Sequence, residues 1–226
     1  MLAAMRGAVG VWRAAGARVW PQVPRLIALN LLWLVAAWPL LTLGAATLTA
    51  YAWLRRAVLE VEDERLDQAP ADPPVPEESF ASLPTFLGRL WWPGTLWAGL
   101  QVLVGLSLAA ALLLGASLPG TLTQALLWVL GFYLAWFWLA LQPFLLDALA
   151  ERVALSRALG GAVRIVLAYP LYAHLCALPP LGLAALGWWF GTLWPLIGVS
   201  LLLVYWAHVA TGDPAPRRPD RVHDLL

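Results

Sequence analysis

The sequence contains no lysine, only one cysteine and few charged residues of either sign. Because Cys176 has no second cysteine to pair with, an intrachain disulfide and a thiolate metal cluster are both excluded. Charged residues make up 12% of the 226 positions, whereas a typical soluble domain is about one-quarter charged. The net charge of +1 gives no basis for the basic surface that nucleic-acid binding requires. Nucleic acid is therefore set aside as a partner.

Apolar residues supply 62% of the chain, and several apolar runs are long enough to cross a bilayer. A helix needs about 20 such residues to span a hydrocarbon core of about 30 Å. The runs Gly94–Leu118 and Thr121–Leu146 meet this length and lack the period-two alternation of barrel strands. The composition therefore predicts an all-α fold, a polytopic transmembrane helical bundle surrounded by the lipid bilayer.

Residues 1–20 carry apolar side chains at helical spacing, with Arg6, Arg13 and Arg18 spread among them. A cleaved signal peptide has an uninterrupted apolar core after its charges, and this segment has none. The prolines that follow at positions 21 and 24 are a further difference from a signal peptide. We expect a retained, basic amphipathic helix that lies at the membrane interface and ends near Trp20.

Residues 21–66 contain the first strongly apolar stretch, Leu26–Leu54. Pro39 and the turn residues Thr42 to Gly44 interrupt it, so we expect a membrane hairpin whose second helix extends into the cytoplasm. Residues 67–82 are rich in proline and acids and poor in large apolar side chains, which is typical of a solvated linker.

Residues 83–211 form the rest of the predicted bundle, and residues 212–226 a polar cytoplasmic tail. A short interfacial helix is expected before Pro93, and the segment Asp147–Arg164 is polar enough to leave the membrane. The two further hairpins expected here have the arms Gly94–Leu118 with Thr121–Leu146, and Ile165–Phe190 with Leu193–His208.

Arginines mark one side of this arrangement, because basic residues that flank membrane helices stay in the cytoplasm. The turns between the arms of each hairpin carry no charge. Six membrane segments in three hairpins, with both termini cytoplasmic, fit this pattern. Alternatively, the first hairpin is re-entrant and the chain crosses the membrane four times. The arginines concerned are Arg6, Arg13, Arg18, Arg25, Arg55, Arg56, Arg89, Arg152, Arg157, Arg164, Arg217, Arg218 and Arg221.

Several short motifs lie between Leu26 and Gly99: Asn30-Leu-Leu-Trp33, Trp38-Pro39-Leu-Leu-Thr42-Leu-Gly44-Ala-Ala46, Ala50-Tyr51, Arg55-Arg56, and Phe86 with Arg89. Together they resemble the opening of the YesL family of bacterial membrane proteins, except that Ala45 stands where that family usually has proline. The resemblance implies a protein of the bacterial cytoplasmic (inner) membrane. It also implies a context of carbohydrate uptake, because genes of this family often lie beside those of carbohydrate ABC transporters.

Polar residues inside apolar segments are the candidates for function. Asn30 is expected to hydrogen-bond to another helix, in preference to binding a ligand. Thr42 and Gly44 are expected to cap the second arm of the first hairpin. The free N–H groups there would also suit an anion or a sugar hydroxyl.

Gln101, Gln124 and Gln142 could line a polar path through the bundle. Asp147 could take part in proton coupling, but its position at the end of a span favours a solvated carboxylate. His174 lies near Cys176, but a zinc site needs three or four ligands, so no metal is predicted.

The sequence contains no nucleotide-binding loop, nucleophile triad or intramembrane carboxylate pair, so we expect neither catalysis nor a cofactor. The leading hypothesis is an accessory membrane protein that associates with ABC-transporter subunits or with further copies of itself. An autonomous small-solute transporter and a structural, lipid-organising protein are the alternatives.

Overall fold

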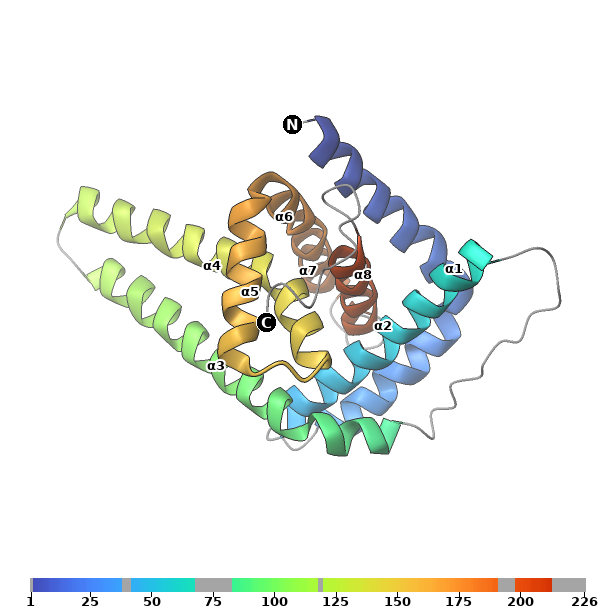
Figure 1. Cartoon of the computed structure of the whole chain (residues 1–226). Helices are drawn as coiled ribbons and strands as arrows, with labels where there is room; N and C mark the ends of the chain where they lie inside the picture. Colours follow the sequence, from blue (N-terminus) through green and yellow to red (C-terminus); the bar gives the residue numbers. More distant parts are fainter. Residues whose placement is uncertain (1, 38–41, 68–82, 118–119, 191–197, 213–226) are drawn as a thin grey trace.

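The computed structural model describes residues 2–37, 42–67, 83–117, 120–190 and 198–212, and within these ranges every element is a helix (Figure 1). The all-α class is therefore confirmed for the described residues. The elements are α1 (Leu2–Ala37), α2 (Leu43–Asp67), α3 (Leu83–Ser117), α4 (Thr121–Ala150), α5 (Leu155–Ala168), α6 (Pro170–Cys176), α7 (Leu178–Phe190) and α8 (Val199–Thr211).

Helix α1 runs without interruption through Pro21 and Pro24, so the helix end expected near Trp20 is wrong. Its first half buries Ala8, and its second half buries Leu26, in the same apolar core. A proline inside a helix costs about 3 kcal/mol, and packing along both halves of α1 offsets this. One face of the first half of α1 is thus part of the bundle core, whereas the sequence predicted an interfacial helix.

Helix α3 is also longer than the predicted span, because the segment expected as a separate interfacial helix continues through Pro93. In contrast, the arm predicted over residues 165–190 is divided into the end of α5, then α6 and α7. The interruptions lie at Tyr169 and Ala177, and Pro170 begins α6 because proline cannot donate the backbone hydrogen bond that would continue α5.

The core lies where α2 and the second half of α4 meet α8. Tyr51 of α2, Leu145 of α4 and Val209 of α8 are each almost completely buried there. Helix α5 packs against α4 through small and apolar residues at four-residue spacing: Ala158, Ala162 and Val166. This arrangement brings the middle of α2 to the polar end of α4.

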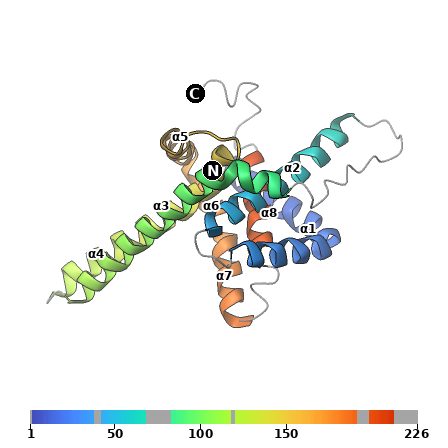
Figure 2. The same ribbon diagram turned by 90° about the horizontal axis from the view of Figure 1, so that it is seen from below.

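Helices α3 and α4 form a long hairpin that stands away from the rest of the bundle (Figures 1 and 2). Large apolar side chains remain exposed near its tip, including Leu113 at 72% and Leu122 at 73%. Such a surface is unfavourable in water and is ordinary in lipid.

Within the part of the chain that the structure describes, three helical segments are long and apolar enough to cross a membrane, which supports a membrane protein with transmembrane helices. They are Leu83–Ser117, Leu122–Ala150 and Pro170–Gly187, and the shorter apolar helices are Gln22–Ala36 and Val199–Thr211.

Candidate functional site

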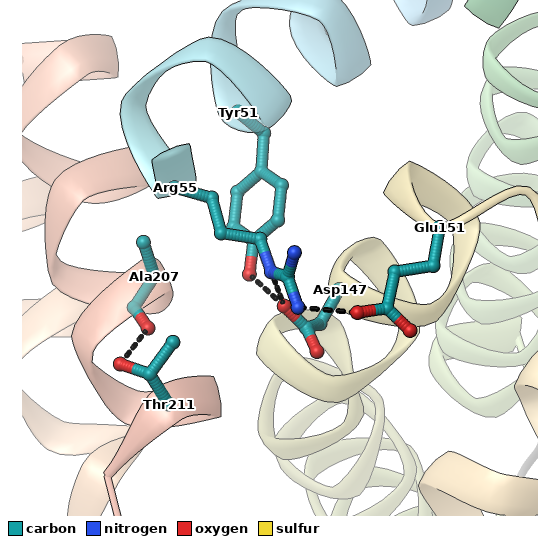
Figure 3. Close-up of polar contacts among 6 residues, drawn as sticks. All are labelled: Tyr51, Arg55, Asp147, Glu151, Ala207 and Thr211. Atoms are coloured by element: carbon teal, nitrogen blue, oxygen red, sulfur yellow. Dashed lines mark hydrogen bonds and ion pairs between the residues drawn. The ribbon is translucent and has the colours of Figure 1, made fainter. Parts of the chain in front are cut away.

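A cluster of polar residues joins α2 to the end of α4 (Figure 3). Arg55 donates through Nε to Oδ1 of Asp147 and through a terminal nitrogen to Oε1 of Glu151. The hydroxyl of Tyr51 donates to the same Asp147 oxygen at 3.3 Å. Tyr51 and Arg55 are four residues apart on α2, and Glu151, the C-cap residue of α4, follows Asp147 by four residues, so each pair presents one face to the other element.

This cluster is sheltered from solvent, since the side chains of Arg55 and Asp147 are only 19% and 24% exposed. Burial by itself would lower the pKa of the Arg55 guanidinium. The negative charges of Asp147 and Glu151 outweigh burial and raise that pKa above its ordinary value. Arg55 therefore stays charged and links two carboxylates, and the solvated Asp147 favoured by the sequence is replaced by an ion-paired one.

A cavity of about 310 Å³ lies beside this cluster, between the middle of α2, the first turns of α3 and the end of α4. Four of the residues that line it are arginines, namely Arg55, Arg56, Arg89 and Arg152. Among the residues that the structure describes, Glu151 is the one carboxylate in its lining. Guanidinium groups therefore outnumber carboxylates among the described residues around the cavity, even when Asp147 is included.

Gln101 of α3 and Gln142 of α4 bond to each other between the two helices, with Nε2 of Gln101 2.6 Å from Oε1 of Gln142. The indole N–H groups of Trp97 and Trp138 donate to Oε1 of Gln142 and Oε1 of Gln101, at 3.1 and 2.8 Å. Gln124 lies in the first turn of α4, 18 residues or about 27 Å along the helix from Gln142. The structure thus brings together two of the three glutamines, and these two hold α3 against α4.

Asn30 of α1 is 1% exposed and contacts the first turn of α8. Its Oδ1 accepts from the backbone N–H of Ser200 at 3.0 Å and from the Ser200 hydroxyl at 2.5 Å. The first N–H groups of a helix have no partner within the helix, so Asn30 caps α8 from a different element. This geometry agrees with the structural role expected for Asn30.

Thr42 immediately precedes α2, and its hydroxyl donates to the carbonyl of Ala36 near the end of α1. Gly44 is buried against α3, where a Cβ atom would lie 2.0 Å from the carbonyl oxygen of Gly94. The first turn of α2 is therefore covered at Gly44, which leaves no room there for the anion or sugar hydroxyl considered from the sequence.

His174 is half-buried in α6, and its buried Nδ1 has no hydrogen-bond partner among the described atoms. Cys176 lies two residues further along, and residues at that spacing do not share a helix face. Within the described ranges, no three His, Cys, Asp or Glu side chains are grouped in a way that could hold a metal ion.

Sequence reasoning missed Tyr51, Arg55 and Glu151 as members of the cluster around Asp147. The available signal was the four-residue spacing of Tyr51 with Arg55 and of Asp147 with Glu151, each at the polar end of an apolar segment. That spacing predicts two polar faces, but it cannot show that the faces meet.

Comparison of the chain with protein-family models, with curated proteins and with solved structures gives no match. The resemblance to the YesL family therefore stays a prediction that rests on the motifs between Leu26 and Gly99.

Proposed function

We propose that this chain is a non-catalytic integral membrane protein that serves as an accessory component of a larger membrane complex. In this proposal it crosses the bilayer six times in three hairpins, with both termini in the cytoplasm. The three long apolar helical segments and the two shorter ones support this arrangement. The apolar part of α1, Gln22–Ala36, is about 22 Å long, so a re-entrant first hairpin is the alternative topology.

The observation that carries the accessory role is the α3–α4 hairpin. Its polar groups near the base are paired inside it, as Gln101 and Gln142 show, while its outer faces are apolar and exposed. Membrane helices associate through close packing of such faces, without any reactive group. A hairpin that leaves its own bundle is suited to lie against the helices of another membrane protein. The resemblance to the YesL family points to the permease subunits of a carbohydrate ABC transporter.

An autonomous transporter has less support. Many secondary transporters place their substrate sites near the middle of the membrane, at discontinuous helices whose ends and unwound backbone groups bind the substrate. Here Gln101 and Gln142 bond to each other and to the indoles of Trp97 and Trp138. A carbohydrate would have to displace these bonds before it could use the glutamines.

Site-directed photocrosslinking in native membranes tests the accessory role. A photoreactive residue at Leu106 of α3 or Leu126 of α4, both exposed on the hairpin, is expected to crosslink to a transporter permease subunit. The same residue at exposed Leu186 of α7 is the matched control and is expected to give far less product. Crosslinks to lipid alone at both hairpin positions, together with purification of the chain free of transporter subunits, would contradict the proposal.

A further inference from the structure

The arginine-lined cavity is built from three separate helices. Arg55 and Arg56 come from α2, Arg89 from α3, and Arg152 from the residue pair that follows α4. Arginine presents a planar fork of N–H donors that matches the oxygens of a phosphate, and several such groups around one cavity favour an anion. The cavity volume of about 310 Å³ is sufficient for a phosphate group with a small organic substituent.

Arg152 adopts a backbone conformation that glycine would adopt more easily. Its φ is 65°, the one positive φ among the described residues other than glycine. Its N–H donates to the carbonyl of Leu149 at 2.9 Å, and the N–H of Val153 donates to that of Ala148 at 3.0 Å. These two bonds form the Schellman ending of a helix, in which the left-handed position is usually glycine. An arginine in this position is strained, and its side chain lines the cavity.

Two of the other arginines are held in place by neighbours. Arg55 is fixed by its bonds to Asp147 and Glu151. The guanidinium of Arg56 stacks over the ring of Phe86 at 4.6 Å from the centroid. Donors held in position by packing lose little entropy when a ligand binds, which favours affinity.

We propose that this cavity binds a phosphate-bearing anion, with Arg89 and Arg152 as its principal donors. The same chemistry is offered by the headgroup of an anionic phospholipid and by a soluble phosphate. Leu90 and Phe86 give the cavity an apolar wall, and Trp91 and Trp92 are exposed on the neighbouring turn. Exposed tryptophans beside a basic cavity are typical of headgroup depth, so the site is accessible from the membrane.

The test measures the melting temperature of the purified full-length chain in non-ionic detergent at about 0.15 M salt, where non-specific attraction is screened. The probes are dioctanoyl phosphatidylglycerol, inorganic phosphate and, as the net-neutral lipid, dioctanoyl phosphatidylcholine. A ligand that binds only the folded state raises the melting temperature in proportion to its occupancy. We expect phosphatidylglycerol or phosphate to raise it at lower concentration than phosphatidylcholine does.

Arg152→Gly is the decisive variant, because glycine relieves the backbone strain and the unliganded chain should melt at the same temperature or higher. It is expected to raise the half-maximal concentration of the anionic probe at least tenfold. Arg89→Gln should do the same, whereas Arg157→Gln removes an exposed charge outside the cavity and should have little effect.

A response to phosphatidylglycerol but not to phosphate identifies the lipid headgroup as the ligand, and the reverse identifies a soluble phosphate. The proposal is overturned if neither anion stabilises the chain more than phosphatidylcholine does. It is also overturned if Arg152→Gly binds as tightly as the unchanged chain, or if Arg157→Gln weakens binding as much as Arg152→Gly.

Discussion

Gly44 of α2 and Gly94 of α3 pack backbone against backbone, so closely that a Cβ on Gly94 would lie 2.5 Å from the Cα of Ala45. Real Cβ atoms essentially never approach other heavy atoms so closely, so the contact requires glycine on both sides. Small residues at helix contacts allow this approach in membranes. The contact fixes the base of the α3–α4 hairpin on the bundle.

Replacement of either glycine should separate α2 from α3. Because neither backbone can yield without moving a helix, we expect Gly44→Ala and Gly94→Ala each to lower the free energy of unfolding by about 1–3 kcal/mol or more. The measurement is unfolding of the purified chain in detergent. Gly99→Ala on α3 is the control, since a Cβ there meets nothing within 4 Å. Equal stability of all three variants would show that the contact is not formed.

The effects on stability of substitutions at Arg55 and Asp147 should be strongly non-additive, because the two side chains form an ion pair. Arg55→Ala leaves the sheltered carboxylate of Asp147 close to that of the exposed Glu151 without a cation, and we expect a loss of about 2 kcal/mol, between the values for surface and buried pairs. The control Arg164→Ala removes an exposed charge from α5 and should cost less than about 0.5 kcal/mol. In a double-mutant cycle, additive effects of Arg55→Ala and Asp147→Ala would argue against the ion pair.

Of the two glutamines on α4, only Gln142, which bonds to Gln101, should contribute to the stability of the fold. Gln142→Leu deprives both Gln101 and the indole of Trp97 of their acceptor, so we expect a loss of about 1 kcal/mol. Gln124→Leu, on the same helix but in its first turn, should change stability by less than about 0.5 kcal/mol. The same unfolding assay measures both variants. A larger effect at Gln124 than at Gln142 would mean that the α3–α4 interface is misassigned.

The six-segment topology predicts that the α3–α4 turn and the start of α5 face opposite sides of the membrane. In a background that carries Cys176→Ala, the Gly120→Cys variant should react with an impermeant maleimide in intact cells. The Arg157→Cys variant should react only after the membrane is opened. Both positions are exposed in the fold, so access is decided by the membrane and not by burial. Labelling of both variants from outside intact cells would rule out this arrangement.

The sequence was sufficient to predict the helical class and the long apolar helices α3 and α4, including the start of α4 at Thr121. These follow from long apolar runs, which need only local information. Proline is a poorer guide, because Pro93, which predicts the start of a span, lies inside α3, and Pro21 and Pro24 lie inside α1 beyond the predicted end of the first helix. Hydrogen bonding along the rest of each long helix continues past a single missing donor.

The contacts between distant residues were not predictable in the same way. Asn30 was identified as a polar residue that bonds across helices, but its partner Ser200 is 170 positions away. Similarly, nothing local to Gly44 indicates that it faces Gly94. An apolar segment predicts that a helix lies against lipid or against other helices. Which helix it contacts depends on the shapes of many side chains together, so local sequence does not reveal it.

The α3–α4 hairpin is attached to the bundle at its base, near Gly94, while its tip is far from the other helices. Gly115 lies 21 residues further along α3, or roughly 32 Å from Gly94. A change of about 10° in the tilt of the hairpin therefore displaces its tip by roughly 6 Å. Bilayers of different thickness are commonly accommodated by changes in helix tilt of this size. Because α4 also carries Leu145 of the core, such a change of tilt is transmitted from the lipid around the tip to the packing around Tyr51.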